Sequence, residues 1–184
     1  MKHSALAVLL SLSLLSCATT LRYSIDYPLT ESTFGSRDGT FSGRVPYGWF
    51  SSDHEELPSM LVSLLIKSDF SATLAFRELQ LDELSRQRVS KEGLRLLAYV
   101  SAALQKNNGS DSIEDIEPQE FELRGKPFCS YEIRSSGNIR RVVLFDAHGK
   151  FYECEARMVK ANSSLADINH LYTVQQTLLF SLIF

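Results

Sequence analysis

The chain has 184 residues and a formal net charge of −3, with 44% hydrophobic and 22% charged residues. This length suits one domain behind a leader segment, and the apolar content is sufficient for a packed core. The acidic balance argues against a nucleic-acid-binding protein, because such proteins carry a clustered basic face. After the N-terminal segment, no apolar run approaches the ~20 residues that a membrane-spanning helix needs.

The N-terminus has the organisation of a secretory signal. Lys2 and His3 supply a short basic start, residues 5–15 are almost entirely Leu, Ala, Val and Ser, and Leu14-Leu15-Ser16-Cys17 closes the run. A basic start, an apolar stretch and a small residue before the cleavage point are typical of such signals. The apolar run of about a dozen residues is ~18 Å long as a helix, so it is too short to span a bilayer.

The end of this run resembles the lipobox of bacterial lipoproteins, in which a Leu, a variable residue and a small residue precede an obligatory Cys. The resemblance implies that residues 1–16 are a lipoprotein signal peptide and that Cys17 becomes the acylated N-terminus. Each buried methylene contributes about 0.8 kcal/mol, so two or three acyl chains hold a protein firmly on a membrane. Ala18 stands where an Asp retains enterobacterial lipoproteins in the inner membrane. We therefore expect a lipid-anchored cell-envelope protein on the periplasmic face of the outer membrane; an ordinary secretory signal with an incidental Cys is the alternative.

The mature sequence predicts a tether followed by a single domain. Residues 17–40 are rich in Thr, Ser, Gly and Tyr and have no apolar period. A flexible coil of that length has a reach of roughly 25 Å. The folded domain is expected over residues 41–184, beginning with a strand at 41–45, a turn at 46–49 and two strands at 60–66 and 71–81.

Two segments have the apolar spacing of helices. Ser90 is a suitable N-cap, and apolar residues follow at intervals of three and four up to about Lys106. The second helix is expected from about Ser164, with Asp167 in its first turn, to Phe180 or beyond.

A three-stranded meander is expected to form the core of the domain. Gly137-Asn138 is a two-residue hairpin signal, which places Ser136 opposite Ile139. A three-residue loop at residues 147–149 then places Asp146 opposite Lys150. This register predicts one inward face, made of Cys129, Tyr131, Ile133, Val142, Leu144, Tyr152, Cys154, Ala156 and Met158, with the charged residues outward.

The three cysteines raise the question of a disulfide. If Cys17 is acylated, Cys129 and Cys154 remain, and an oxidising compartment favours pairing them. The predicted register, however, separates them by about 10 Å across the strands and about 13 Å along them. A disulfide needs Cα atoms within about 7 Å. We therefore predict two buried free thiols.

The predicted element order gives an α+β fold, an antiparallel sheet of about five or six strands with two α-helices on one side. This order, the Pro-x-Gly-Trp at residues 46–49, the hairpin at 149–152 and the closing helix resemble the PsbP-like domains. That group includes the extrinsic photosystem II subunit, the Ran-binding Mog protein and DcrB-type bacterial lipoproteins. The resemblance implies a domain that binds partners. It supplies no catalytic residue, and a fold by itself does not determine function.

The sequence contains no convincing catalytic or metal-binding pattern. His54 lies among acidic neighbours at residues 53–56, but a zinc site needs three or four spaced ligands, so a solvated acidic loop is favoured. Cys129 and Cys154 are predicted inward, which favours small core residues over nucleophiles. No Gly-x-Ser-x-Gly elbow or phosphate-binding glycine loop is present. We expect no enzymatic activity, no metal and no cofactor.

A small basic cluster lies on two adjacent strands of the meander. Arg134, Arg140 and Arg141 could receive a carboxylate or a lipid headgroup. The alternative is that they pair across strands with the acidic residues Glu132, Glu153 and Glu155.

Tyr47, Trp49 and Phe50 are the candidate recognition residues, because aromatic side chains beside a glycine turn suit a partner contact. The alternative is that Trp49 closes the end of the core. We expect a non-enzymatic binding or assembly domain for an unknown envelope protein, held at the membrane through Cys17. A carrier or sensor of a small hydrophobic ligand, bound in the concave sheet, is the other hypothesis.

Overall fold

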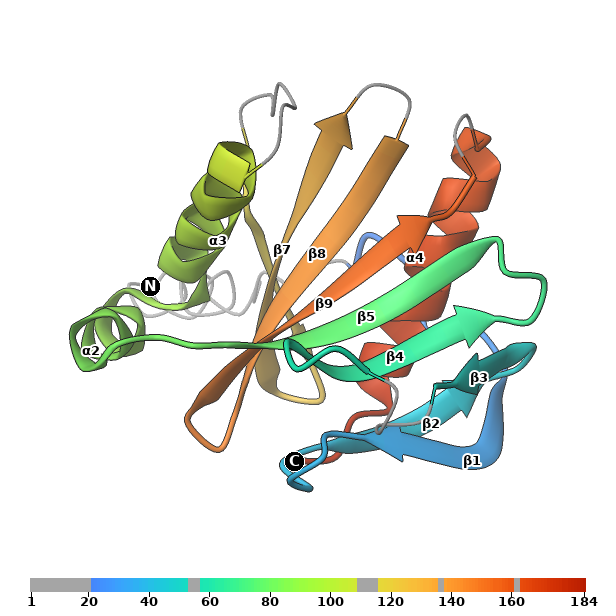
Figure 1. Cartoon of the computed structure of the whole chain (residues 1–184), viewed down its shortest axis with the longest axis horizontal. Coiled ribbons are helices and arrows are strands. Elements are labelled where there is room, and N and C mark those ends of the chain that lie inside the picture. Colours follow the sequence, from blue (N-terminus) through green and yellow to red (C-terminus); the bar gives the residue numbers. More distant parts are fainter. Residues whose placement is uncertain (1–20, 53–56, 109–115, 136–137, 161–162) are drawn as a thin grey trace, which may run out of the picture.

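A computed structural model describes residues 21–52, 57–108, 116–135, 138–160 and 163–184. A seven-stranded antiparallel sheet has the order β3-β4-β5-β9-β8-β7-β6, and a separate hairpin pairs β1 with β2 (Figure 1). The strands are β1 (Leu29–Gly35), β2 (Ser42–Pro46), β3 (Trp49–Ser51), β4 (Leu61–Lys67), β5 (Ala72–Leu79), β6 (Gln119–Leu123), β7 (Lys126–Ser135), β8 (Asn138–Ala147) and β9 (Lys150–Met158). The helices are α2 (Glu83–Glu92), α3 (Leu94–Asn108) and α4 (Leu165–Phe180).

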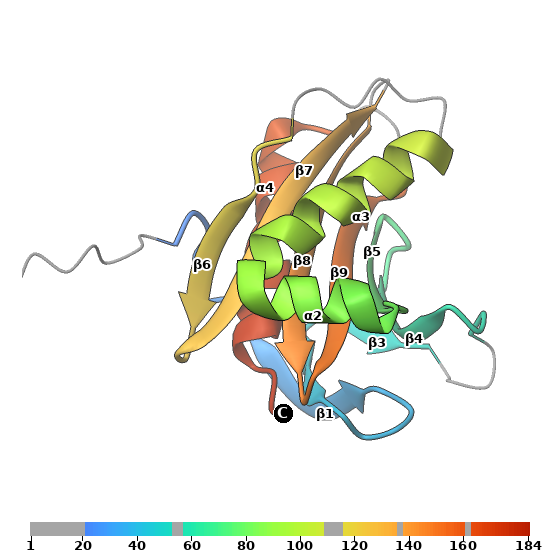
Figure 2. The ribbon, with the colours of Figure 1, turned by 90° about the vertical axis from the view of Figure 1, so that its left-hand side faces the viewer.

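Helices cover both faces of the sheet. Figure 2 shows α2 and α3 in front of the sheet and α4 behind it. The α3 face carries one core cluster, and the α4 face, which also receives the β1–β2 hairpin, carries the larger one. The predicted α+β class is therefore confirmed. The sheet has more strands than the five or six expected, and the expectation of two helices on one side is wrong.

The meander forms, but both of its hairpins are displaced from the predicted register. Ser135 pairs with Asn138 in the first hairpin, so Tyr131 lies opposite Val142 instead of Leu144. In the second hairpin Ala147 pairs with Lys150. The first displacement keeps the same residues on each face, whereas the second, of one residue, inverts β9 relative to β8.

The backbone of His148 explains the second displacement. His148 and Gly149 both have positive φ, 54° and 78°, and they alone connect the paired residues Ala147 and Lys150. A two-residue hairpin turn of type I′ requires positive φ at both central positions, a conformation that His tolerates better than most residues. Asp146 accepts a hydrogen bond from the Gly149 amide at 3.1 Å, which holds the turn. The predicted three-residue loop is therefore wrong.

The inversion divides the expected inward face between two cores. Tyr131, Val142 and the other inward residues of β7 and β8 lie in the α3 cluster, whereas Tyr152 and Cys154 lie in the α4 cluster. Cys129 and Cys154 are both buried free thiols, as predicted. Their separation has a different cause from the one predicted, because they face opposite sides of the sheet.

The helix boundaries follow local capping chemistry. Asp82 caps α2 by accepting from the Ser85 amide at 2.7 Å. Gly93, with φ of 82°, ends α2 and donates to the Val89 carbonyl at 2.8 Å. Ser90, the predicted N-cap, therefore lies inside α2, and α3 begins only after the glycine. Ser164 caps α4 as predicted, by accepting from the Asp167 amide at 3.1 Å.

Much of the predicted tether belongs to the folded domain. Residues 29–35 form β1, and Phe34 is 5% exposed in the α4 cluster. Tyr23 is also buried, with its ring 5.4 Å from that of Tyr172 in an edge-to-face contact. The prediction of a flexible segment over residues 17–40 is wrong for this part, while the lipobox and residues 17–20 lie outside the described residues.

Candidate functional site

Two turns at one end of the sheet place aromatic side chains next to each other. Gly48, with φ of 77°, allows the turn between β2 and β3. The turn between β4 and β5 is joined to it by Ser68, whose amide and hydroxyl donate to the Gly48 carbonyl at 2.9 Å and 2.7 Å. Phe70 lies in this second turn with φ of 57°. These backbone bonds fix the aromatic residues of both turns relative to one another.

Three aromatic rings are exposed at this end, and we call Tyr47, Phe50 and Phe70 the aromatic patch. Their exposed fractions are 68%, 39% and 66%, and the rings of Phe50 and Phe70 lie 5.9 Å apart at 73°. Phe50 is paired with half-buried Ile66 of β4. The α3 helix packs on β6, β7 and β8, and Figure 1 shows it on the β7 side of the sheet, away from β3–β5. The patch therefore has no helix over it in the described part of the chain.

Trp49 has a different place from its neighbours. It is 7% exposed and belongs to the α4 cluster, because alternation along β3 turns it away from Phe50. The structure thus brings Tyr47 and Phe50 to the surface and places Trp49 at the end of the core, which was the alternative interpretation. The sequence interpretation missed Phe70, although an aromatic residue between Asp69 and Ser71 in a polar turn was a usable signal.

A pocket of about 520 Å³ lies beside Trp49, between the start of α4 and the ends of β4, β5 and β9. Its apolar wall includes Trp49, Met158 and Leu171, and its polar groups include Lys67 and His170. The Trp49 indole N–H is buried and has no hydrogen-bond partner among the described groups. The pocket volume lies within the range of small-molecule sites, about 300–1,000 Å³.

Among the described residues, neither cysteine is activated as a nucleophile and no cluster of metal ligands is found. Burial raises the pKa of Cys129 and of Cys154 to about 12, so both thiols stay protonated and unreactive at neutral pH. No group of three or more His, Cys, Asp and Glu side chains gathers among these residues. His148 lies in a turn and His170 is exposed, while the predicted acidic loop around His54 falls outside the described residues.

The predicted basic cluster is divided by the sheet. Arg140 of β8 approaches Glu155 of β9 at 3.6 Å, which is a cross-strand pair of the kind expected. Arg134 approaches Glu132 at 3.5 Å, but both residues lie on β7, so this pair is formed within one strand. Arg141 points to the α4 face and is buried at 4% exposure. It makes no ion pair with the described residues.

No protein-family model matches the sequence, and no curated protein matches it. Solved structures of similar fold include the following two. The cyanobacterial PsbP protein CyanoP of Synechocystis sp. PCC 6803 has a TM-score of 0.54 and 11% identity, covering 93% of this chain and 98% of its own. The Ran-binding protein Mog1p of Saccharomyces cerevisiae has a TM-score of 0.54 and 12% identity, covering 85% of this chain and 96% of its own.

These likenesses show that the chain has a PsbP-like α+β fold, as the sequence predicted. At such identities they show the fold alone. Within the described residues, no helix has both the length and the apolar character needed to cross a membrane.

Proposed function

We propose that the protein is a lipid-anchored, non-enzymatic binding or assembly module of the cell envelope, and that its aromatic patch contacts a partner protein. The observation that carries this proposal is the exposure of Tyr47, Phe50 and Phe70 together at one end of the sheet. Aromatic residues are enriched at protein interfaces, and contiguous exposed apolar surface marks interaction sites. The Ran-binding protein Mog1p has the same fold, which is consistent with partner binding.

The membrane anchor is tested at Cys17. We expect wild-type protein in the membrane fraction, with an intact mass raised by acylation, because two or more acyl chains hold a protein on a bilayer. Cys17→Ala should be lost from that fraction. An unmodified, freely soluble wild-type product would instead make this an ordinary secreted protein.

The aromatic patch is tested by photo-crosslinking in intact cells. With p-benzoylphenylalanine in place of Phe70, we expect one discrete adduct with a partner protein. Tyr47→Ser combined with Phe50→Ser should lower its yield by more than tenfold, because the loss of one interface aromatic that is worth about 2 kcal/mol already weakens binding about 30-fold. The measurement is the adduct band and its mass.

Leu84 on α2 is the matched control position, because it is 69% exposed and lies on a different surface. The same photo-reactive residue at Leu84 should give no such adduct. Equal yields at the two positions, or a yield that Tyr47→Ser and Phe50→Ser leave unchanged, would contradict the assignment of the patch.

A carrier or sensor of a small hydrophobic ligand is the second candidate function, favoured by the pocket beside Trp49. Trp49 is the single tryptophan of the chain, so its fluorescence reports on this pocket. We expect decanoate to change the emission saturably, and Ser71→Phe, at the pocket wall, to abolish the change. Phe50 lies next to Trp49 on β3 but points to the opposite face, so Phe50→Ser should leave the decanoate titration unaltered. Without a saturable change, this function is excluded for fatty acids.

A further inference from the structure

Arg141 of β8 is a buried cation that is held by neutral groups. Its Nη1 donates to Gln175 Oε1 at 3.1 Å, and its Nη2 donates to Gln176 Oε1 at 2.9 Å. The guanidinium carbon lies 4.8 Å from the centre of the Tyr23 ring and 5.4 Å from that of Phe121. Amide oxygens and ring faces stabilise a cation but do not neutralise it.

Burial without a counter-charge is unfavourable for this cation. The loss of water lowers the pKa of Arg141 to about 10, because desolvation disfavours the charged form. Buried charges in proteins are ordinarily paired with an opposite charge. An anion next to Arg141 would therefore be stabilised more than at an exposed arginine.

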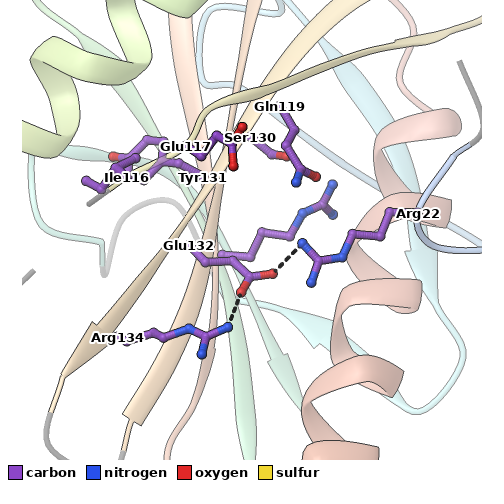
Figure 3. Close-up of a pocket in the computed structure, with 9 residues that line it drawn as sticks. Arg22, Ile116, Glu117, Gln119, Ser130, Tyr131, Glu132 and Arg134 are labelled. Atoms are coloured by element: carbon purple, nitrogen blue, oxygen red, sulfur yellow. Dashed lines mark hydrogen bonds and ion pairs between the residues drawn. The ribbon is translucent and has the colours of Figure 1, made fainter. Parts of the chain in front are cut away.

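The carboxylate of Glu132 lies opposite Arg141 in the β7–β8 register but is bonded elsewhere. It approaches Arg22 Nη1 at 3.2 Å and Arg134 Nη2 at 3.5 Å, and it accepts from the Tyr23 hydroxyl at 3.3 Å. Figure 3 shows Glu132 between Arg22 and Arg134, with dashed lines to both. Three arginines are thus arranged around one carboxylate.

A polar pocket of about 230 Å³ opens at this point, and all three arginines line it. Its two acidic residues are Glu117 and Glu132, which leaves one net positive charge in a chain whose formal net charge is −3. Each guanidinium carries five N–H donors, and the described contacts use only some of them.

We propose that this pocket binds an oxyanion group, a phosphate or a carboxylate, between Arg22, Arg134 and Arg141. Planar guanidinium forks match the oxygens of such groups and bind them by charge-assisted hydrogen bonds. The anion shares Arg22 and Arg134 with Glu132 and gives Arg141 its counter-charge. Because Glu132 competes for the same donors, this carboxylate limits the affinity of the site.

The phosphate can come from a lipid headgroup or from a soluble molecule. Arg22 follows Cys17 by five residues, a separation of at most about 18 Å along the chain. If Cys17 is acylated, as in the proposed function, the pocket lies within reach of the headgroups. The headgroup source depends on that anchor, whereas the anion site itself does not.

The site is tested on the mature chain carrying Cys17→Ala, so that the result is independent of acylation. Inorganic phosphate, titrated by calorimetry at constant ionic strength, should bind the wild-type pocket. Arg134→Gln and Arg141→Lys should each weaken binding by about tenfold, because each removes charge-assisted hydrogen bonds. Arg134 is exposed, so its variant keeps the test valid if a change at Arg141 disturbs folding. Glu132→Gln should strengthen binding.

Arg88→Gln and Glu92→Gln are the matched controls, since they change the same charges in an exposed pair on α2. Both should leave phosphate binding unchanged. Vesicles of phosphatidylglycerol, compared with phosphatidylcholine, distinguish the source. Binding to phosphatidylglycerol vesicles but not to phosphatidylcholine vesicles, if it is lost in Arg134→Gln and kept in Arg88→Gln, assigns a lipid headgroup. Binding of inorganic phosphate in solution assigns a soluble anion. If neither probe binds, or if Arg88→Gln weakens binding as much as Arg134→Gln, the proposal is overturned.

Discussion

Phe41→Ala is expected to lower the free energy of unfolding by about 3–5 kcal/mol, as do large-to-small substitutions of buried aromatic residues. Phe41 is 1% exposed and leads into β2, at the position where the sequence predicted that the folded domain begins. Its ring centre lies 5.1 Å from that of Tyr152, 5.4 Å from Phe76 and 5.7 Å from Phe145. Truncation would leave a cavity lined by rings from three central strands.

Urea-induced unfolding, followed by circular dichroism, measures this loss. Tyr47→Ala is the matched control, since Tyr47 is 68% exposed beyond the other end of β2 and should change stability by less than about 0.5 kcal/mol. If Phe41→Ala changed stability no more than this control, the β1–β2 hairpin would not be packed on the sheet.

The elements with strong periodic or capping signals were predictable from the sequence. The closing helix begins at Ser164 because its hydroxyl satisfies a first-turn amide, and local chemistry of this kind is readable without the fold. Strands β4, β5, β7, β8 and β9 likewise follow apolar patterns, whereas β6, with the mostly polar sequence QEFEL, was not predicted. The separate helix α2 was missed, because its exposed polar sequence buries little besides Val89.

The register of β9 could not be predicted from the turn residues alone. The prediction placed only Gly149 in the left-handed region, whereas in the structure His148 adopts it as well. The loop between β8 and β9 is therefore one residue shorter than predicted, and the two faces of β9 are exchanged. The sequence could not show this, since β8 is apolar on both faces, with Val142 and Leu144 on one and Val143 and Phe145 on the other. Either register therefore places the apolar side of β9 beside apolar residues of β8. Assuming a one-sided sheet therefore made an incorrect register look consistent.

The N-terminal packing and the arginine pocket were missed for different reasons. Apolar residues alternate with other residues over positions 21–29, a period of two that is typical of an extended segment with one face on the core, and the prediction of a tether overlooked it. Phe34 is isolated in its polar surroundings and gave no such signal. Arg141 was predicted to face solvent, yet α4 covers it and supplies Gln175 and Gln176 as acceptors. A search of the α4 sequence for apolar residues alone does not reveal that these two glutamine side chains are buried.

Arg77→Met is expected to lower the free energy of unfolding by about 3–5 kcal/mol, the usual result of removing one partner from a buried ion pair. Arg77 Nη1 lies 3.1 Å from Glu153 Oε1 and 3.0 Å from Glu155 Oε2, and both glutamates are 5% exposed. Glu153 would keep one neutral donor, the Ser101 hydroxyl at 3.1 Å. Glu155 would keep only the longer contact to Arg140 at 3.6 Å. Two buried carboxylates, two residues apart on the same face of β9, would then repel each other.

The measurement is again urea-induced unfolding, with Arg88→Met as control. Arg88 faces Glu92 at 3.6 Å in an exposed pair on α2, and such pairs contribute about 0.3–0.5 kcal/mol. Adding Glu153→Gln and Glu155→Gln to Arg77→Met should restore part of the stability, since no unpaired charge then remains buried. If the triple variant were less stable than Arg77→Met alone, the loss would come from the packing of the Arg77 stem and not from the charges of the two glutamates.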